Sequence, residues 1–229
     1  GLDAFINSIE NKQILPYNKI KGFIQTSVPG HIGQFVYGYI NSIPILCAQG
    51  RMHYYEGHSF ENVGIIIKVF NYYQPDSIII TNSSGCLRVD WEIGEFMLTK
   101  KIIDFSFIDS NLPKIYKLNT DLELNTKIYS GTYAYTIGPT YETKAEINEI
   151  INLGGNAVGM STFPEYLMCK KFGIDPIIIS CLTNYGAGLT NQEVLHKDVL
   201  KNAEKVKLEF TALIRGIIQN TVRQRKQKI

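Results

Sequence analysis

The chain has 229 residues, of which 45% are hydrophobic and 19% are charged, and its formal net charge is +2 at pH 7. This length is typical of one large α/β domain, so we expect a single domain over residues 1–229. The small net charge argues against nucleic acid or a membrane surface as a partner. No apolar run approaches the roughly 18 residues that a membrane-spanning helix needs.

Cysteine usage and the first residues predict a cytoplasmic protein. Four cysteines lie in or beside apolar segments and form no CxxC pair: Cys47, Cys86, Cys169 and Cys181. This pattern is typical of buried, reduced thiols. The opening stretch, GLDAFINSIENK, contains acidic residues and lacks the basic and apolar regions of a secretory signal.

Apolar runs that alternate with helical patterns predict an α/β fold. The predicted strands are Gln34–Ile40, Ile43–Ala48, Ser77–Thr81, Glu95–Phe105, Asn156–Met160 and Pro176–Thr183. The predicted helices are Ser59–Tyr73, Glu142–Leu153, Phe163–Phe172 and a C-terminal helix from about Asn191 to Asn220. Capping boxes at Thr162-x-x-Glu165 and Thr190-x-x-Glu193 mark two helix starts. We therefore expect a mixed or parallel central β-sheet flanked by helices.

Polar or small residues follow four of these strands. The stretches are QGRMHYYEGH (Gln49–His58), NSSG (Asn82–Gly85), STFPE (Ser161–Glu165) and NYGAG (Asn184–Gly188). In open α/β sheets a ligand binds beyond the carboxyl ends of the strands. The four stretches should therefore meet at one edge of the sheet.

Each stretch has a functional and a purely structural interpretation. NSSG can curve into a nest of backbone amides that binds an anion, or it can be a routine turn. Ser161 can offer an anion its hydroxyl and a helix N-terminus, or it can only cap that helix. Arg51 can bind phosphate as a forked donor or be a solvated surface residue, and His53 can join it or be a core histidine. Their shared edge favours the anion-binding interpretation.

Several common catalytic motifs are missing from the sequence. It contains no HExxH, GxSxG, GxxxxGK[ST] or GxGxxG motif, and His53 and His58 lie five residues apart in a predicted loop. The sequence therefore predicts no metal site, covalent nucleophile or nucleoside triphosphate site. An enzyme that binds inorganic phosphate together with a neutral polyol or base remains compatible.

Six stretches in order along most of the chain closely resemble the trimeric purine nucleoside phosphorylases. They are VPGHIGQFVYG (Val28–Gly38), QGRMHYYEGH (Gln49–His58), DSIIITNSSGCL (Asp76–Leu87), GPTYETKAE (Gly138–Glu146), GGNAVGMSTFPE (Gly154–Glu165) and LTNYGAGLTNQEVLHKDVL (Leu182–Leu200). The resemblance implies a nucleoside-phosphorylase-like fold and a homotrimeric enzyme of purine salvage. In the implied reaction, phosphate attacks C1′ of a 6-oxopurine nucleoside such as inosine or guanosine and releases the base and ribose 1-phosphate. The resemblance implies no metal or organic cofactor.

The matching motifs also imply roles for individual residues. The implied phosphate-binding residues are His31, Arg51, His53, Ser83 through its backbone amide, and Ser161. The implied ribose-binding residues are Tyr55, Met160 and Asn191, and the implied base-binding residues are Tyr141, Glu142 and Asn184. Asn184, His53 and Glu56 are the expected catalytic set, with Glu56 orienting its neighbours.

The physical chemistry of the reaction agrees with these roles. Cleavage of an N-glycosidic bond places positive charge on the ribose and negative charge on the leaving purine, so preorganised donors matter more than a nucleophilic side chain. Asn184 can donate to the purine as charge accumulates there. Glu142, accepting from a ring N–H, favours 6-oxopurines because adenine presents an acceptor at that edge.

Departures from the family leave other hypotheses open. The family's first phosphate loop resembles GSGL, whereas this sequence begins at Gly1–Leu2 without that serine, and only FSFIDSNLPKI lies between Asp104 and Tyr116 where the family has a longer loop. Asn191 stands where the family usually has histidine. One alternative is a 5′-methylthioadenosine phosphorylase, against which Asn184 and Glu142 argue. The other is a catalytically degenerate homologue that binds nucleoside without turnover.

Overall fold

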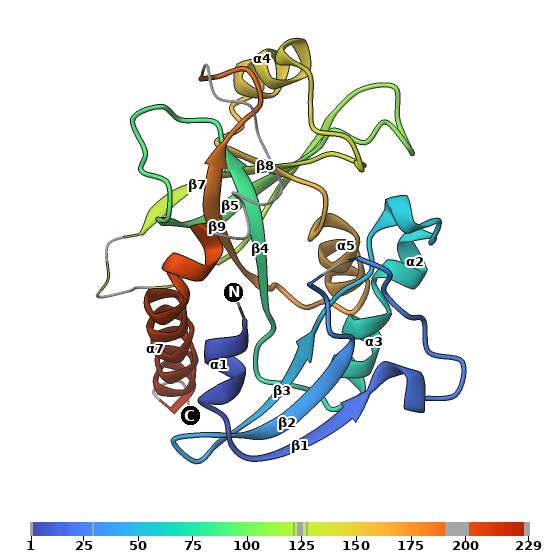
Figure 1. Cartoon of the computed structure of the whole chain (residues 1–229), viewed down its shortest axis with the longest axis vertical. Coiled ribbons are helices and arrows are strands. Elements are labelled where there is room, and N and C mark those ends of the chain that lie inside the picture. The colour runs from blue at the N-terminus through green and yellow to red at the C-terminus, as the bar shows by residue number, and fades with distance from the viewer. Residues whose placement is uncertain are drawn as a thin grey trace.

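The structure is a computed structural model that describes residues 2–28, 30–120, 122, 126, 128–190 and 202–226. Its strands form two sheets (Figure 1). The smaller sheet is an antiparallel meander of β1 (Glu10–Pro16), β2 (Gln34–Ile40) and β3 (Ile43–Gln49). In β2, Val36 and Ile40 are buried while Tyr37 between them is exposed, which is the period of two that predicted this strand.

The larger sheet is mixed and has the strand order β6-β5-β7-β8-β4-β9. Its strands are β4 (Ile79–Cys86), β5 (Phe96–Asp104), β6 (Lys114–Lys117), β7 (Tyr129–Tyr135), β8 (Ala157–Gly159) and β9 (Ile177–Tyr185). Because β5 also pairs with β9, five of these strands close into a barrel. The predicted mixed central sheet is confirmed, and its closure is an addition that the sequence did not predict.

Helices pack on both sheets and bury three apolar clusters. Helices α3 (Ile65–Tyr72) and α5 (Phe163–Lys171) pack against the cluster that contains Met97 and Tyr133. Helix α4 (Lys144–Asn152) covers a second cluster at the other end of the sheet. Helices α1 (Asp3–Asn7) and α7 (Lys207–Lys226) lie side by side and share the third, through Phe5 and Phe210 (Figure 1). None of the described helices is long and apolar enough to cross a bilayer.

Some elements were not predicted from the sequence. Helix α1 and strands β1, β6 and β7 have no counterpart among the predicted elements. Strand β1 is exposed at six of its seven positions, so it carries no apolar alternation. Strand β7 contains Gly131, where a Cβ atom would lie 2.7 Å from Sδ of Met97, so the neighbouring strand packs directly against its backbone.

The predicted helix Ser59–Tyr73 is two helices, α2 (Phe60–Val63) and α3, which divide at Gly64. A Cβ atom at Gly64 would lie 3.0 Å from Cβ of Met168, so the break brings the backbone close to α5. The C-terminal helix α7 begins at Lys207. The predicted start near Asn191 and the capping residue Glu193 lie outside the described residues.

Neither interpretation of NSSG, the nest or the routine turn, is correct, because these residues belong to a strand. Strand β4 continues to Cys86, and its Ser83 and Ser84 pair with Cys181 and Leu182 of β9. The register of this parallel pair shifts between Ser84 and Gly85. The ladder therefore holds the backbone extended where a nest would need it to curve.

Candidate functional site

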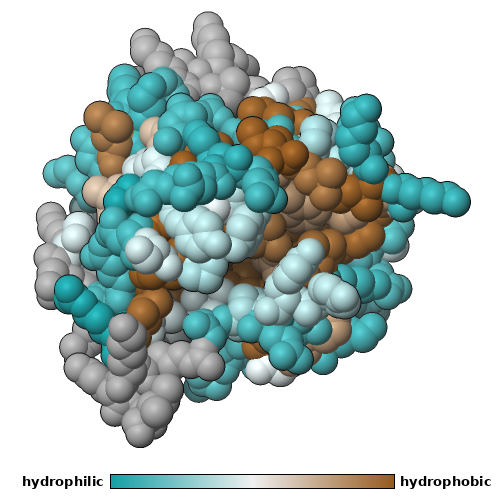
Figure 2. Space-filling model, turned by 90° about the horizontal axis from the view of Figure 1, so that it is seen from below, coloured by the Kyte–Doolittle hydropathy of each residue, from teal (hydrophilic) through white to brown (hydrophobic). Residues whose placement is uncertain are grey.

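A cavity of about 1500 Å³ lies between β3 of the small sheet and β4 of the barrel. The face seen in Figure 2 is hollowed, and hydrophobic side chains gather around the hollow. One part of the cavity wall is apolar and includes Leu2, Phe5 and Phe210. The other part is polar and contains ten of the predicted site residues: His31, Arg51, His53, Tyr55, Ser83, Tyr141, Glu142, Met160, Ser161 and Asn184.

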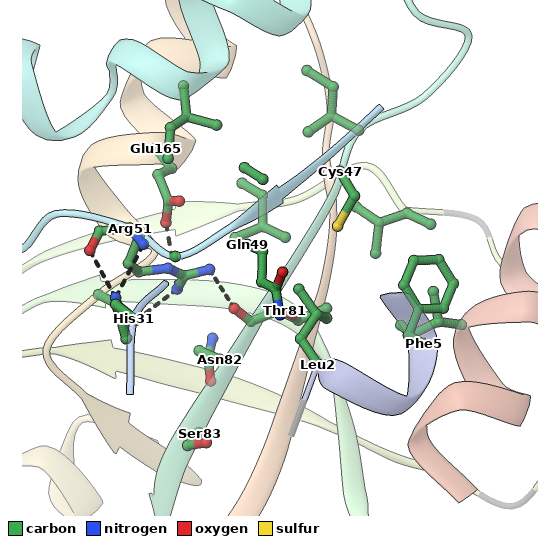
Figure 3. Close-up of a pocket in the computed structure, with 18 of the residues that line it drawn as sticks. Leu2, Phe5, His31, Cys47, Gln49, Arg51, Thr81, Asn82, Ser83 and Glu165 are labelled. Carbon is green, nitrogen blue, oxygen red and sulfur yellow. Dashed lines mark hydrogen bonds and ion pairs between the residues drawn. The ribbon is translucent and has the colours of Figure 1, made fainter. Parts of the chain in front are cut away.

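Arg51 follows β3 and extends its guanidinium group across to the barrel (Figure 3). Nη1 donates to Oγ of Ser161 at 2.9 Å, and Nη2 donates to the backbone oxygen of Thr81 at 2.5 Å. Nη1 also lies 3.6 Å from Oε2 of Glu165, whose side chain is only 5% exposed. The contacts aim a forked cation at the cavity beside a serine hydroxyl, as phosphate binding requires.

His31 and His53 lie beside this guanidinium group. Nδ1 of His31 is 3.0 Å from the backbone nitrogen of Arg51 and 2.8 Å from its backbone oxygen, which holds the ring against that residue. The His31 and His53 rings are 5.1 Å apart. Burial, and then the charge of Arg51, lowers the pKa of His53 to about 4. Burial also lowers the pKa of His31. Both rings are therefore neutral near pH 7, and each has one N–H to donate and one nitrogen that accepts.

Glu56 joins two parts of the chain that flank the site. Its Oε1 accepts from the backbone N–H of His53 at 2.6 Å and lies 3.3 Å from Nδ1 of the same residue. Its Oε2 accepts from the backbone N–H and the hydroxyl of Ser27, at 2.7 and 2.9 Å. Burial alone would raise the pKa of Glu56, but these hydrogen bonds outweigh burial and lower it. The ionised carboxylate does not line the cavity and contacts its neighbours instead, so its role in orienting them stays a prediction.

Ser161 lies between β8 and α5, and the barrel holds it from behind. Its backbone oxygen accepts from the hydroxyl of Tyr133 at 3.0 Å. The next residue, Thr162, has a φ of +76°, and its hydroxyl accepts from Nδ2 of Asn82 at 2.9 Å. The predicted cap at this start is present, since Oε2 of Glu165 accepts from the backbone N–H of Thr162 at 3.2 Å. The N-cap is thus Thr162 and not Ser161, whose hydroxyl instead accepts from Arg51.

Glu142 and Tyr141 come together at the start of α4. Glu142 is 9% exposed, and its Oε1 accepts from the hydroxyl of Thr136 at 2.6 Å. Burial raises the pKa of Glu142, and the hydrogen bond from Thr136 opposes that rise. Tyr141 is 41% exposed. A buried acceptor beside a half-exposed aromatic ring is suited to the edge and the face of a purine.

Asn184 lies at the end of β9, one residue beyond the predicted strand. Its Nδ2 donates to the backbone oxygen of Tyr185 at 2.8 Å, and its Oδ1 accepts from the hydroxyl of Thr183 at 3.0 Å. Gly85 lies opposite Asn184 in the ladder, where a Cβ atom would come within 3.4 Å of Nδ2. The amide is therefore held by its own strand, and one of its two N–H hydrogens remains for a ligand.

Tyr55 and Met160 enclose Gly138. A Cβ atom at Gly138 would collide with Sδ of Met160 and lie 3.0 Å from Cδ1 of Tyr55, so a side chain here would force Met160 to move. The Tyr55 ring also stacks on His53, with centroids 4.8 Å apart and an interplanar angle of 15°. Tyr55 therefore connects His53, which lies beside Arg51, with Gly138 and Met160.

The structure places most predicted site residues in one cavity, with three qualifications. Ser83 lines the cavity, although it does so from an extended strand and not from a nest. Glu56 lies behind the cavity wall, and Asn191 lies outside the described residues. Among the described residues no group of three His, Cys, Asp or Glu side chains is placed to hold a metal ion.

Four supporting residues were missed by the sequence analysis: Ser27, Asn82, Tyr133 and Thr136. Asn82 and Thr136 stand inside or beside strands, where a hydroxyl or amide has no distinctive spacing. Ser27 reaches Glu56 across 29 positions of sequence. Asn82 lies within the stretch DSIIITNSSGCL, and Thr136 lies two positions before GPTYETKAE.

Comparisons with known proteins all point to one family. Residues 2–219 match the family described as the phosphorylase superfamily. The chain is 32% identical over 241 residues to purine nucleoside phosphorylase 1 of Geobacillus stearothermophilus, covering 96% of this chain and 88% of the relative. It is 28% identical over 250 residues to purine nucleoside phosphorylase of Bos taurus, covering 95% and 86%.

Solved structures agree with these relatives. The fold matches a Schistosoma mansoni purine nucleoside phosphorylase in complex with inosine, with a TM-score of 0.79 and 26% identity, over 93% of this chain and 86% of that chain. It also matches isoform 2 of the enzyme from the same species, in complex with cytosine and ribose-1-phosphate, with a TM-score of 0.81 and 28% identity. That match covers 95% of this chain and 86% of that chain.

Proposed function

Because the chain belongs to the phosphorylase superfamily, and within it to the purine nucleoside phosphorylases, we propose that its cavity performs phosphorolysis of 6-oxopurine nucleosides. The observation that carries the proposal is the arrangement of the cavity wall. On one part of the wall, Nη1 of Arg51 lies 2.9 Å from Oγ of Ser161. On another part lie the buried carboxyl group of Glu142 and the amide of Asn184. Phosphate and purine thus have separate binding groups in one cavity.

The reaction exchanges one bond at C1′ for another. An oxygen of phosphate forms a bond to C1′ while the bond from C1′ to N9 breaks, and its electron pair stays on the purine. The products are ribose 1-phosphate and the free base, which takes up a proton. Arg51 and Ser161 hold the attacking phosphate, and the neutral His53 adds a donor beside it.

The leaving purine needs groups that accept its developing negative charge. Asn184 donates its remaining N–H to the purine, and a single donor of this kind is typically worth about 3 kcal/mol of barrier. Glu142 accepts from the ring N–H of a 6-oxopurine. This chemistry calls on no metal or organic cofactor, and inorganic phosphate is the co-substrate. Tyr55, Met160 and Tyr141 line the same cavity, which supports the roles that the resemblance implies for them at the ribose and the base.

The test is phosphate-dependent release of hypoxanthine from inosine, with 5′-methylthioadenosine as a parallel substrate. Inosine turnover that requires phosphate, and that falls at least about tenfold in Asn184→Ala, supports the proposal. Turnover of 5′-methylthioadenosine alone would assign the cavity to methylthio nucleosides. Binding of inosine without turnover of either substrate would make the chain a degenerate homologue.

The homotrimer is also a proposal, and exposed apolar side chains support it. Between β5 and the first residues of β6, four large hydrophobic side chains are exposed: Phe107, Ile108, Leu112 and Ile115. Such a gathering is typical of a protein–protein contact. Light scattering after size-exclusion chromatography would measure the assembly. A role in purine salvage and a location in the cytoplasm stay predictions from the sequence.

A further inference from the structure

The hydrogen bond between Thr136 and Glu142 has no part in the roles assigned so far. We propose that Thr136 is a positioning residue that sets the orientation and the ionisation of Glu142, and thereby selects 6-oxopurine over 6-aminopurine nucleosides. The proposal rests on the proposed function, because it assumes that Glu142 meets the purine.

The contacts of Thr136 fix the orientation of the Glu142 side chain at the cavity. Thr136 follows β7 directly, and its backbone N–H donates to the backbone oxygen of Gly159 at 3.0 Å, which fixes it against β8. Its hydroxyl then donates to Oε1 of Glu142 at 2.6 Å. Both side chains are about nine-tenths buried. This hydrogen bond fixes the orientation of the carboxylate, whose remaining lone pairs can accept from a ring N–H.

The charge surroundings of Glu142 make this hydroxyl important. The titratable groups that act on it or that it acts on are Glu146 of α4, Tyr141 beside it and Tyr133 of β7. Burial, and to a smaller extent the like charge of Glu146, raises the pKa of Glu142, and the hydrogen bonds from the Thr136 hydroxyl and from the backbone N–H of Glu142 oppose that rise. Removal of the hydroxyl therefore favours the protonated carboxyl.

Protonation of Glu142 would exchange an acceptor for a donor. A 6-oxopurine presents an N–H at ring position 1, which needs an acceptor, whereas adenine presents a bare nitrogen there, which needs a donor. The ionised carboxylate suits the first base and the protonated carboxyl suits the second. A threonine hydroxyl that holds the ionised form thus contributes to the choice of substrate.

The test compares the full chain with Thr136→Val, which keeps the shape and loses the hydroxyl, and with Thr136→Ser, which keeps the hydroxyl. For each protein, kcat and KM for inosine and adenosine are measured from pH 5.5 to 8.5 at saturating phosphate. We expect Thr136→Val to raise the KM for inosine at least tenfold at pH 6, and less at pH 8. We also expect the preference for inosine over adenosine to fall at least tenfold at pH 6.

Thr136→Ser should stay within threefold of the parent chain in both measurements. A purely structural role would lower activity toward both nucleosides alike and without dependence on pH, and that result would overturn the proposal. Equal profiles for Thr136→Val and the parent chain would overturn it as well. If the parent chain cleaves neither nucleoside, the proposed function fails, and the KM comparison is replaced by the binding constants of hypoxanthine and adenine for the three proteins over the same pH range. The same pH-dependent loss of hypoxanthine binding in Thr136→Val would then uphold the proposal, and its absence would overturn it.

Discussion

Nη1 of Arg51 donates to Oγ of Ser161 at 2.9 Å, although the two residues are 110 positions apart in the sequence. One residue follows β3 of the small sheet, and the other precedes α5 beside the barrel. The phosphate-binding groups of the proposed reaction therefore come from both sheets. The distance between these groups depends on how the two sheets pack together. The site is therefore not formed by any single short segment of the sequence.

Replacement of Arg51 by lysine should weaken phosphate binding. Lysine keeps the charge but cannot reach Ser161 and Thr81 with two separate N–H groups, as the guanidinium group does. Hydrogen bonds to charged groups are worth about 1.5–3 kcal/mol, so the KM for phosphate should rise about 10- to 150-fold. The matched control is Arg88→Lys, since Arg88 forms an exposed pair with Asp90. An unchanged KM for phosphate in Arg51→Lys would contradict the assigned role.

Glu56→Gln should destabilise the site without touching a ligand directly. The carboxylate accepts from His53 and from Ser27, and a glutamine amide must turn an N–H toward one of these donors. We expect the free energy of unfolding to fall by about 1–3 kcal/mol. Urea denaturation measures it, with Glu61→Gln as control because Glu61 pairs with Lys68 at the surface. An equal decrease in the free energy of unfolding in Glu56→Gln and Glu61→Gln would show that the hydrogen bonds of Glu56 add no more stability than a surface ion pair.

Stability should decrease on acidification because of His53. Its pKa is lowered to about 4 in the folded chain from an ordinary value of 6.5, so the unfolded chain binds the proton first as the pH falls. The loss begins below pH 6.5 and levels off below pH 4, and from pH 7.5 to 5 it amounts to about 2 kcal/mol. In urea titrations at these two pH values, His53→Gln should lose less stability than the parent chain. An identical loss in both proteins would mean that His53 titrates normally.

Gly138→Ala should impair nucleoside binding more than the fold. The new Cβ atom would collide with Met160 and approach Tyr55, both of which line the cavity, and φ at this position is +71°. Gly22→Ala is a matched control, because Gly22 has a φ of +75° and nothing within 4 Å of the added atom. Both variants should lose about 1 kcal/mol of stability from backbone strain.

The kinetic result should separate the two glycine variants. We expect kcat/KM for inosine to fall at least tenfold in Gly138→Ala and to stay within twofold in Gly22→Ala. A similar fall in both would trace the effect to strain and not to contact with Met160.

Much of the site was predictable because its residues lie in short sequence motifs, which can be recognised without knowledge of any tertiary contact. QGRMHYYEGH brings Arg51, His53 and Tyr55 to the cavity, and its position after β3 follows from a local apolar run. Strand β2 has the predicted bounds because its alternation of buried and exposed residues is a property of the sequence itself. The family resemblance rested on the same motifs, and the comparisons confirm it.

Long-range pairing decided the rest. Ser83 belongs to a strand because β9 pairs with it, although Ser-Ser-Gly locally favours a turn. The barrel closes because β5 pairs with β9, and the register of that pairing cannot be predicted from either segment alone. The sequence by itself predicted which residues would line the site, since side-chain types and family motifs are properties of short segments. Only the tertiary structure decided that Thr136 faces Glu142 and that Arg51 reaches Ser161, because both contacts depend on how strands from distant segments are held side by side.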